Sequence, residues 1–138
     1  MSLSGFIEKN YSGNLEGYRF ECDKNLPSTP IGTGCVMYAY YSTAMYGTVG
    51  TAAQIGTPRT SSSGHTALEA FTPRQVYSLD KKIDDGLASN GTLYAVRGGN
   101  YENQAGKCVN ADYDDPSANY ELGDTDITCR IFYWYKKE

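Results

Sequence analysis

The stretch from Phe71 to Gly98 constrains the fold most, because the beginning of a helix is encoded in it residue by residue. Thr72 is a favoured N-cap residue, and Pro73 follows at the first helical position, where a missing N–H costs no hydrogen bond. Gln75 stands three residues after Thr72 and completes a capping box. The sequence therefore predicts a helix that begins at Pro73.

The predicted helix has one apolar side and a defined end. Val76, Leu79 and Ile83 recur at helical spacing and predict the stripe that packs on the core. Gly86 is expected to close the helix as the left-handed C′ residue. Residues 92–96 then have the composition of a strand. The unit is a short capped helix that leads into a strand.

Two carboxylates, Asp84 and Asp85, lie at the end of this helix, where the helix dipole disfavours negative charge by roughly 0.3–1 kcal/mol each. Lys81 and Lys82 offset part of that effect. The simpler interpretation is a solvated acidic end in which Asp85 bonds to the following turn. The alternative is that the carboxylates meet a cation or an arginine such as Arg97.

The composition indicates one domain, residues 1–138, that is large enough to bury about two-thirds of its unfolded surface. Glycine (15) and tyrosine (13) are abundant and charged residues make up only 20%, which favours a sheet- and loop-rich fold over a helical bundle. With the single predicted helix, the fold class is α+β. The formal net charge of −4 argues against a nucleic-acid or anionic-membrane surface.

Four cysteines are spread along the chain without a CxxC pair: Cys22, Cys35, Cys108 and Cys129. An even number at such spacing predicts two disulfides and an oxidising compartment. Three connectivities are possible, and we expect sequential pairing because each sequential pair closes a loop that contains turn residues. A zinc site is disfavoured, because the spacing fits no structural-zinc pattern and the chain has a single histidine.

The remaining segments are assigned by alternation and by their content of Gly, Pro, Asn and Asp. Strands are predicted at residues 18–22, 35–41 and 127–135. Loops are predicted at 23–34, at 44–64 with one weak strand at 48–55, and at 98–121. Both faces of the 127–135 strand carry aromatic residues, so this strand is expected to be central or covered by a helix. The 44–64 loop is the expected partner-facing surface.

No constellation for catalysis is present in the sequence. His65 is the single histidine, and four residues of proximity to Ser61 do not make a triad. Acidic residues crowd the loop between Cys108 and Cys129, and calcium binds oxygen ligands in such segments. Candidate calcium ligands are Asp84, Asp85, Asp112 and Asp114. The spacing is not that of an EF-hand, so charge that keeps the loop soluble is the simpler interpretation. A glycosidase that uses two of these carboxylates is a remote alternative, since nothing fixes their separation.

The central and C-terminal segments resemble a known family. The run 72–86 (TPRQVYSLDKKIDDG) and the strand 91–98 (GTLYAVRG) are similar to bacterial type IV pilin-like proteins and type II secretion pseudopilins, in which a helix ending in Ile-Asp-Asp-Gly leads to a turn and a strand. The loop from Cys108 to Cys129 resembles the disulfide-bounded region of pilins. The resemblance covers residues 66–135.

The resemblance implies a globular head in which an antiparallel sheet packs on the remnant of a long N-terminal helix. Residues 1–5 are expected to combine an expression scar with that truncated remnant. The full-length subunit would carry a basic leader, cleaved before a methylated residue, and an apolar helix that anchors it in the inner membrane. Its partners would be other pilin or pseudopilin subunits of a pilus or a protein-transport system, its head would be monomeric and periplasmic or extracellular, and its role would be non-catalytic.

A second class of function is consistent with the same residues. The many tyrosines could supply stacking faces for a ligand, so a secreted carbohydrate- or surface-binding module is the alternative. The segment that precedes the chain in its reading frame discriminates the two, because a pilin needs an apolar anchor helix and a secreted module needs a cleavable signal.

Overall fold

The computed structural model describes residues 20–31, 33–45, 47–59, 68–99, 106–111 and 115–138. The described chain forms four strands and one helix in the order β1 (Cys35–Met45), β2 (Thr48–Gly56), α1 (Pro73–Ile83), β3 (Leu93–Arg97) and β4 (Cys129–Lys137). The strands make a single antiparallel sheet in the order β1-β2-β4-β3. The predicted α+β class is confirmed.

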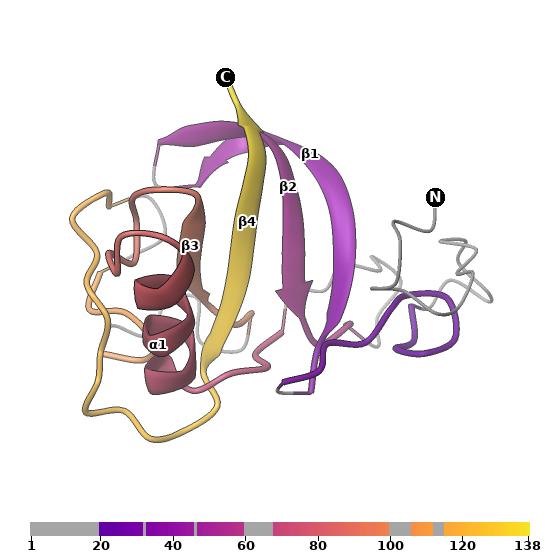
Figure 1. Ribbon diagram of the computed structural model, residues 1–138, viewed down its shortest axis with the longest axis horizontal. Coiled ribbons are helices and arrows are strands. Elements are labelled where there is room, and N and C mark those ends of the chain that lie inside the picture. Colours follow the sequence, from indigo (N-terminus) through magenta and orange to yellow (C-terminus); the bar gives the residue numbers. More distant parts are fainter. Residues whose placement is uncertain (1–19, 32, 46, 60–67, 100–105, 112–114) are drawn as a thin grey trace.

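The helix covers only one end of the sheet. In Figure 1, α1 lies beside β3 and the lower part of β4, whereas β1 and β2 have no helix in front of them. The segment that follows β3 runs along the outer side of α1, so α1 is enclosed between the sheet and this loop. The core therefore sits under α1, at the β3 end of the sheet.

The start of α1 follows the sequence prediction in detail. Thr72 is the N-cap, and its Oγ1 accepts a hydrogen bond from the backbone N–H of Gln75 at 3.3 Å. The Gln75 side chain accepts one from the backbone N–H of Thr72 at 2.9 Å, which completes the capping box. Phe71 and Val76 are both buried, as expected for a staple.

The end of α1 differs from the prediction. Ile83 was expected in the buried stripe but is 55% exposed, and Asp80 is the fully buried residue of that turn. The carboxylate tolerates burial because it accepts hydrogen bonds from Tyr120 Oη at 2.7 Å and from the Gly86 N–H at 3.2 Å. The C-cap is Asp84, so the C′ residue is Asp85 and not Gly86 as predicted. Gly86 follows one position later and has the left-handed conformation that was expected of it, with φ +76°.

Most of the described part of 44–64 is strand, so the long surface loop predicted there is wrong, whereas the strand predicted within it at 48–55 is confirmed. That strand is β2, which has nine residues and is paired on both sides, by β1 and by β4. Ala52 and Ala53 are buried there beneath larger neighbours, because Ala53 pairs with Tyr38 and Tyr133, and Ala52 with Trp134. Small residues thus fit a central strand, because the larger side chains of the neighbouring strands β1 and β4 supply the apolar area. Residues 60–64 lie outside the described chain.

A glycine lets the sheet curve at one end. The register between β2 and β4 shifts between Thr51 and Ala52, and Gly50, with φ +145°, approaches the Lys136 carbonyl so closely that a Cβ would overlap it. Beyond this bulge, Thr48 Oγ1 reaches the Tyr94 hydroxyl at 2.8 Å, although β4 lies between their strands. The β1–β2 hairpin therefore bends across β4 toward β3.

The strand β4 is central, one of the two arrangements that its sequence predicted, and its two faces are different. Phe132 and Trp134 are buried on one face with ring centroids 6.1 Å apart, and Tyr94 adds an edge contact to Trp134 at 5.8 Å. On the other face Ile131 is buried, whereas Tyr133 and Tyr135 are exposed. Figure 1 shows α1 beside the first part of β4 only, and the end of the strand extends beyond the helix.

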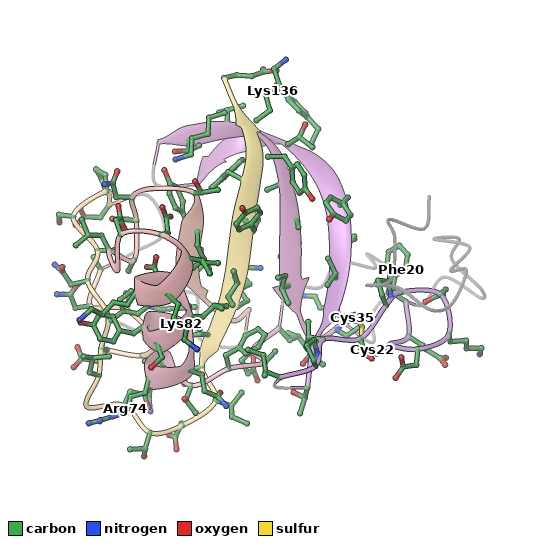
Figure 2. All side chains as sticks on the ribbon, viewed as in Figure 1. Phe20, Cys22, Cys35, Arg74, Lys82 and Lys136 are labelled. Atoms are coloured by element: carbon green, nitrogen blue, oxygen red, sulfur yellow. A yellow bond between two sulfur atoms is a disulfide. The ribbon has the colours of Figure 1, made fainter. Side chains whose placement is uncertain are left out.

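Both predicted disulfides form, Cys22–Cys35 and Cys108–Cys129. Figure 2 shows the first at the foot of β1. The strand predicted at 18–22 is wrong for its described part, because residues 21–26 form a turn in which the Asp23 N–H donates to the Leu26 carbonyl at 2.8 Å. Two disulfides indicate that the chain folds in an oxidising, extracellular or periplasmic compartment.

Local backbone contacts cover parts of the two outer strands. The Ala95 N–H on β3 donates to the Ala88 carbonyl at 2.8 Å, so the connection after α1 pairs with the outer edge of that strand. On β1 the Val36 N–H donates to the Pro27 carbonyl at 2.9 Å, next to the bridge between Ser28 and Cys35. The first contact lies at the middle of β3, and the second lies at the start of β1.

The disulfides should dominate the resistance to unfolding. Each closes a loop, with sequence separations of 13 and 21, for which the chain-entropy model gives a stabilisation of about 3 kcal/mol. Replacing Cys108 and Cys129 by serine should lower the melting temperature by roughly 10 °C in calorimetry. The Cys22→Ser/Cys35→Ser double variant is the matched comparison. An unchanged midpoint in both would contradict the structural role of the pairs.

Candidate functional site

Three carboxylates meet at the end of α1. Asp80, Asp84 and Asp85 each offer an oxygen atom within 4.8 Å of the others. Two of them, Asp84 and Asp85, are candidate calcium ligands from the sequence, and Asp80 is an addition that the sequence did not single out. Asp112 and Asp114, the other two candidates, lie outside the described residues.

The protein itself supplies hydrogen-bond donors to Asp84 and Asp85. Asp84 Oδ2 accepts from the backbone N–H groups of Thr92 and Leu93, the latter at 2.8 Å, and so links the helix end to the start of β3. Asp85 Oδ1 accepts from the Leu87 N–H at 2.8 Å. The bond from Asp85 to the following turn is the one expected for a solvated acidic helix end.

A glycine accommodates the Asp84 carboxylate. Gly91 has φ +69°, and a Cβ built on it would overlap the carboxyl group of Asp84. The Ser89-Asn90-Gly91 turn therefore needs glycine for two reasons, its left-handed backbone and the close approach of the carboxylate. The Asp84 carboxylate at the end of α1 therefore connects the helix to the start of β3.

Arg97 belongs to a different part of the structure from the one the sequence suggested. Its side chain is 2% exposed, and its guanidinium donates to the backbone carbonyls of Val109 at 3.3 Å, Lys107 at 3.2 Å and Ala111. The arginine thus holds the segment after β3 onto the sheet. Asp84, its hypothetical partner, is occupied by the N–H groups at the start of β3.

Asp124 organises the loop that ends at Cys129. Its Oδ2 accepts from Thr128 Oγ1 at 2.7 Å and from the Cys108 N–H at 3.2 Å, and its Oδ1 lies 3.8 Å from Lys107 Nζ. Burial raises the pKa of Asp124, but the hydrogen bonds, together with the lysine, outweigh it and hold the pKa below its usual range. This carboxylate has a structural role in the disulfide loop.

A second candidate site is the uncovered half of the sheet. We call the exposed surface lined by Tyr38, Tyr40, Tyr133 and Tyr135 the tyrosine face. Tyr38 and Tyr135 are 58% and 60% exposed, their hydroxyl oxygens are 3.1 Å apart, and their ring centroids are 5.4 Å apart. Tyr133 lies 5.9 Å from Tyr135 between ring centroids.

The tyrosine face is uncharged over its centre. The hydrogen bond with Tyr135, together with partial burial, raises the pKa of Tyr38 to about 12, so the Tyr38 hydroxyl group is protonated at neutral pH. The hydrogen bond to Glu138 raises the pKa of Tyr40 as well. Charges lie at the tip of β4, where Figure 2 shows Lys136. The centre can therefore pack against another neutral surface.

The sequence missed the tyrosine face as a unit, although it noted the tyrosines. Tyr38 and Tyr135 are 97 residues apart, and only the strand order brings them together. The available signal was alternation: tyrosines two residues apart in each of two strands must share a face.

His65, the single histidine that was considered for catalysis, lies outside the described residues.

Comparisons with protein-family models, with curated proteins and with solved structures gave no match. In the described part of the chain no helix is long and apolar enough to cross a membrane.

Asp80 should make stability depend on pH. Burial, despite the hydrogen bonds from Tyr120 and Gly86, raises the pKa of Asp80, and the charges of Asp84 and Asp85 add to that effect. A raised folded-state pKa means that the folded chain binds more protons, so this contribution is present below the unfolded pKa of about 3.9 and is lost as pH rises through the folded pKa.

The variant Asp80→Asn isolates that contribution. Relative to this variant, the wild-type free energy of unfolding should fall as pH rises from 3 to 7, measured by urea denaturation at each pH. Asp115 has a lowered pKa, from its hydrogen bonds with Ser117, and contributes with the opposite sign in both proteins. Parallel profiles for the two proteins would show that the burial of Asp80 does not perturb its titration.

Calcium binding at the helix end is tested by thermal unfolding. Since Asp84 and Asp85 already accept hydrogen bonds, we expect the melting temperature to be the same with excess calcium and with chelator. A rise with calcium that disappears in Asp85→Asn and in Asp112→Asn would instead establish the carboxylates as a metal site. Asp126→Asn, an exposed carboxylate of the disulfide loop, is the matched control.

Proposed function

We propose that this chain is the globular head of a minor pilin or pseudopilin, a non-catalytic subunit of a bacterial type IV pilus or type II secretion system. The two segments that resemble that family pack as one unit, which is the observation that carries the proposal. Phe71, which precedes the helix, and Cys129, which begins β4, exchange backbone hydrogen bonds of 2.9 and 3.1 Å. The Cys108–Cys129 disulfide joins the C-terminal loop to the same point.

The tyrosine face supplies a surface for assembly. Its residues share one face of the sheet, since Tyr133 is paired with Ala53, whose other partner is Tyr38. An exposed, uncharged aromatic surface of this kind is typical of interaction sites. In a pilin-like subunit the long N-terminal helix or a neighbouring head would cover it.

The disulfides agree with the compartment that this role requires. A pilin head folds on the periplasmic face of the inner membrane, where disulfides form, and is later displayed outside the cell. The anchor would be an apolar helix that precedes the present chain. Assembly and surface display, with other pilin or pseudopilin subunits as partners, would then be its whole activity.

The alternative is a secreted carbohydrate- or surface-binding module. The same tyrosine face favours it, because exposed rings on a rigid sheet can stack on sugars. The two functions need different full-length proteins, an anchored one and a freely secreted one.

The reading frame upstream of Phe6 decides between them. We expect a short basic leader followed by about 20 apolar residues, the length that spans the hydrocarbon core of a bilayer. A conventional cleavable signal, or none, would refute the filament proposal and favour the secreted module.

The role of the tyrosine face can be tested in the full-length protein, expressed in the organism that carries its gene. The double variant Tyr38→Ser/Tyr135→Ser should reduce incorporation into sheared filaments by at least tenfold, because it removes both exposed rings. Ile127→Ser, which alters an exposed apolar residue of the disulfide loop, is the matched control and should assemble normally. Normal assembly of the tyrosine variant would exclude this face from the filament contact.

A further inference from the structure

A pocket of about 470 Å³ lies between two connections that the preceding sections leave without a ligand-binding role. One wall is the connection from α1 to β3, and the other is the loop residues 116–119. Ser89, Tyr94 and Ala118 form a buried floor, while Leu87, Asn90 and Asn119 are exposed at the rim. The volume falls in the range of about 300–1,000 Å³ that is usual for small-molecule sites.

Hydrogen bonds hold the two walls together. Ser89 Oγ is within reach of two carbonyls on the opposite wall, that of Pro116 at 2.6 Å and that of Ala118 at 3.3 Å. The loop wall is fixed in turn by Asn110, whose Oδ1 accepts from the Asn119 N–H at 2.9 Å and whose N–H donates to the Asn119 carbonyl at 3.0 Å. A site with walls tied in this way needs little ordering when a ligand enters.

The rim offers oriented amide groups. Asn90 Nδ2 donates to Asp85 Oδ2 at 2.8 Å, and Asn119 Nδ2 donates to the Ser117 carbonyl at 3.0 Å. Each bond fixes the amide by its nitrogen, and within the described chain neither side-chain carbonyl oxygen of Asn90 or Asn119 accepts a hydrogen bond. Both oxygens are therefore available to hydroxyl or N–H groups of a ligand.

The chemistry of the lining points to a neutral, hydroxylated molecule. Among the residues that the structure describes, no charged side chain lines the pocket, and Leu87 and Pro116 add apolar surface at its rim. Two carboxylates accept hydrogen bonds from rim residues, Asp85 from Asn90 and Asp115 from Ser117, and their negative charge disfavours an anionic ligand. Sugar rings combine hydroxyl donors with an apolar C–H face, which matches this combination of groups.

We propose that this pocket binds one unit of a neutral carbohydrate. The hydroxyl groups donate to the amide oxygens of Asn90 and Asn119, and the C–H face rests on Leu87 and Pro116. The site is separate from the tyrosine face and does not depend on filament assembly, so it would equip either a pilin head or a secreted module to recognise a glycan.

The test is a titration of the ¹⁵N-labelled 138-residue chain followed by NMR. The probes are the N-acetylglucosamine trimer, maltotriose and lactose, with oligogalacturonate as the anionic comparison. At least one neutral sugar should give saturable shifts at residues 87–90 and 116–119, and oligogalacturonate should give none. Asn119→Ala should weaken that binding about three- to tenfold, the effect of one hydrogen bond, and Asn90→Ala/Asn119→Ala should abolish it.

Two further variants locate the site. Tyr133→Ser alters the tyrosine face and should bind with unchanged affinity. Leu87→Lys places a long charged side chain at the exposed rim and should weaken binding without disturbing the fold, which keeps the test valid if an asparagine variant does not fold. The proposal is overturned if no neutral sugar shifts these residues, if Leu87→Lys binds as well as the wild type, or if the shifts map to the tyrosine face.

Discussion

The covalent bond between Cys108 and Cys129 meets the backbone pairing between Cys129 and Phe71 at one point of the structure. Cys129 is the first residue of the central strand β4, and Phe71 lies two residues before α1 begins. Helix, sheet and C-terminal loop are therefore positioned by a single residue. Because Cys129 is completely buried, nothing at this junction can be rearranged without opening the core.

Around that junction the loop is held by polar groups as much as by apolar burial. Arg97 donates to carbonyls of the segment after β3, and Tyr120 reaches back to Asp80 on α1. Buried polar groups are costly when one partner is lost, so these contacts favour one arrangement of the loop over others. The pocket lined by residues 116–119 depends on that arrangement of the loop, and so does the position of α1 between the loop and the sheet.

Local signals explain what the sequence could predict. The capping box at Thr72 involves residues three apart, each disulfide closes a short loop, and the aromatic residues on both faces of 127–135 predicted a strand that is central or covered by a helix. Non-local effects explain the failures. Asp80 is buried because Tyr120, 40 residues away, supplies a donor, and the small residues of β2 are central because Tyr38, Tyr133 and Trp134 surround them. Composition alone describes neither case.

The two edges of the sheet have different consequences for self-association. The outer edge of β3 is blocked by the connection after α1, through the bond between Ala95 and Ala88. On the outer edge of β1, backbone contacts from elsewhere in the described chain reach only its first two residues, Cys35 and Val36. An edge with open backbone donors and acceptors is a template for strand addition. Within the described part of the chain, strand addition is therefore favoured at β1 over β3, and an extended peptide or a second copy would join the sheet there.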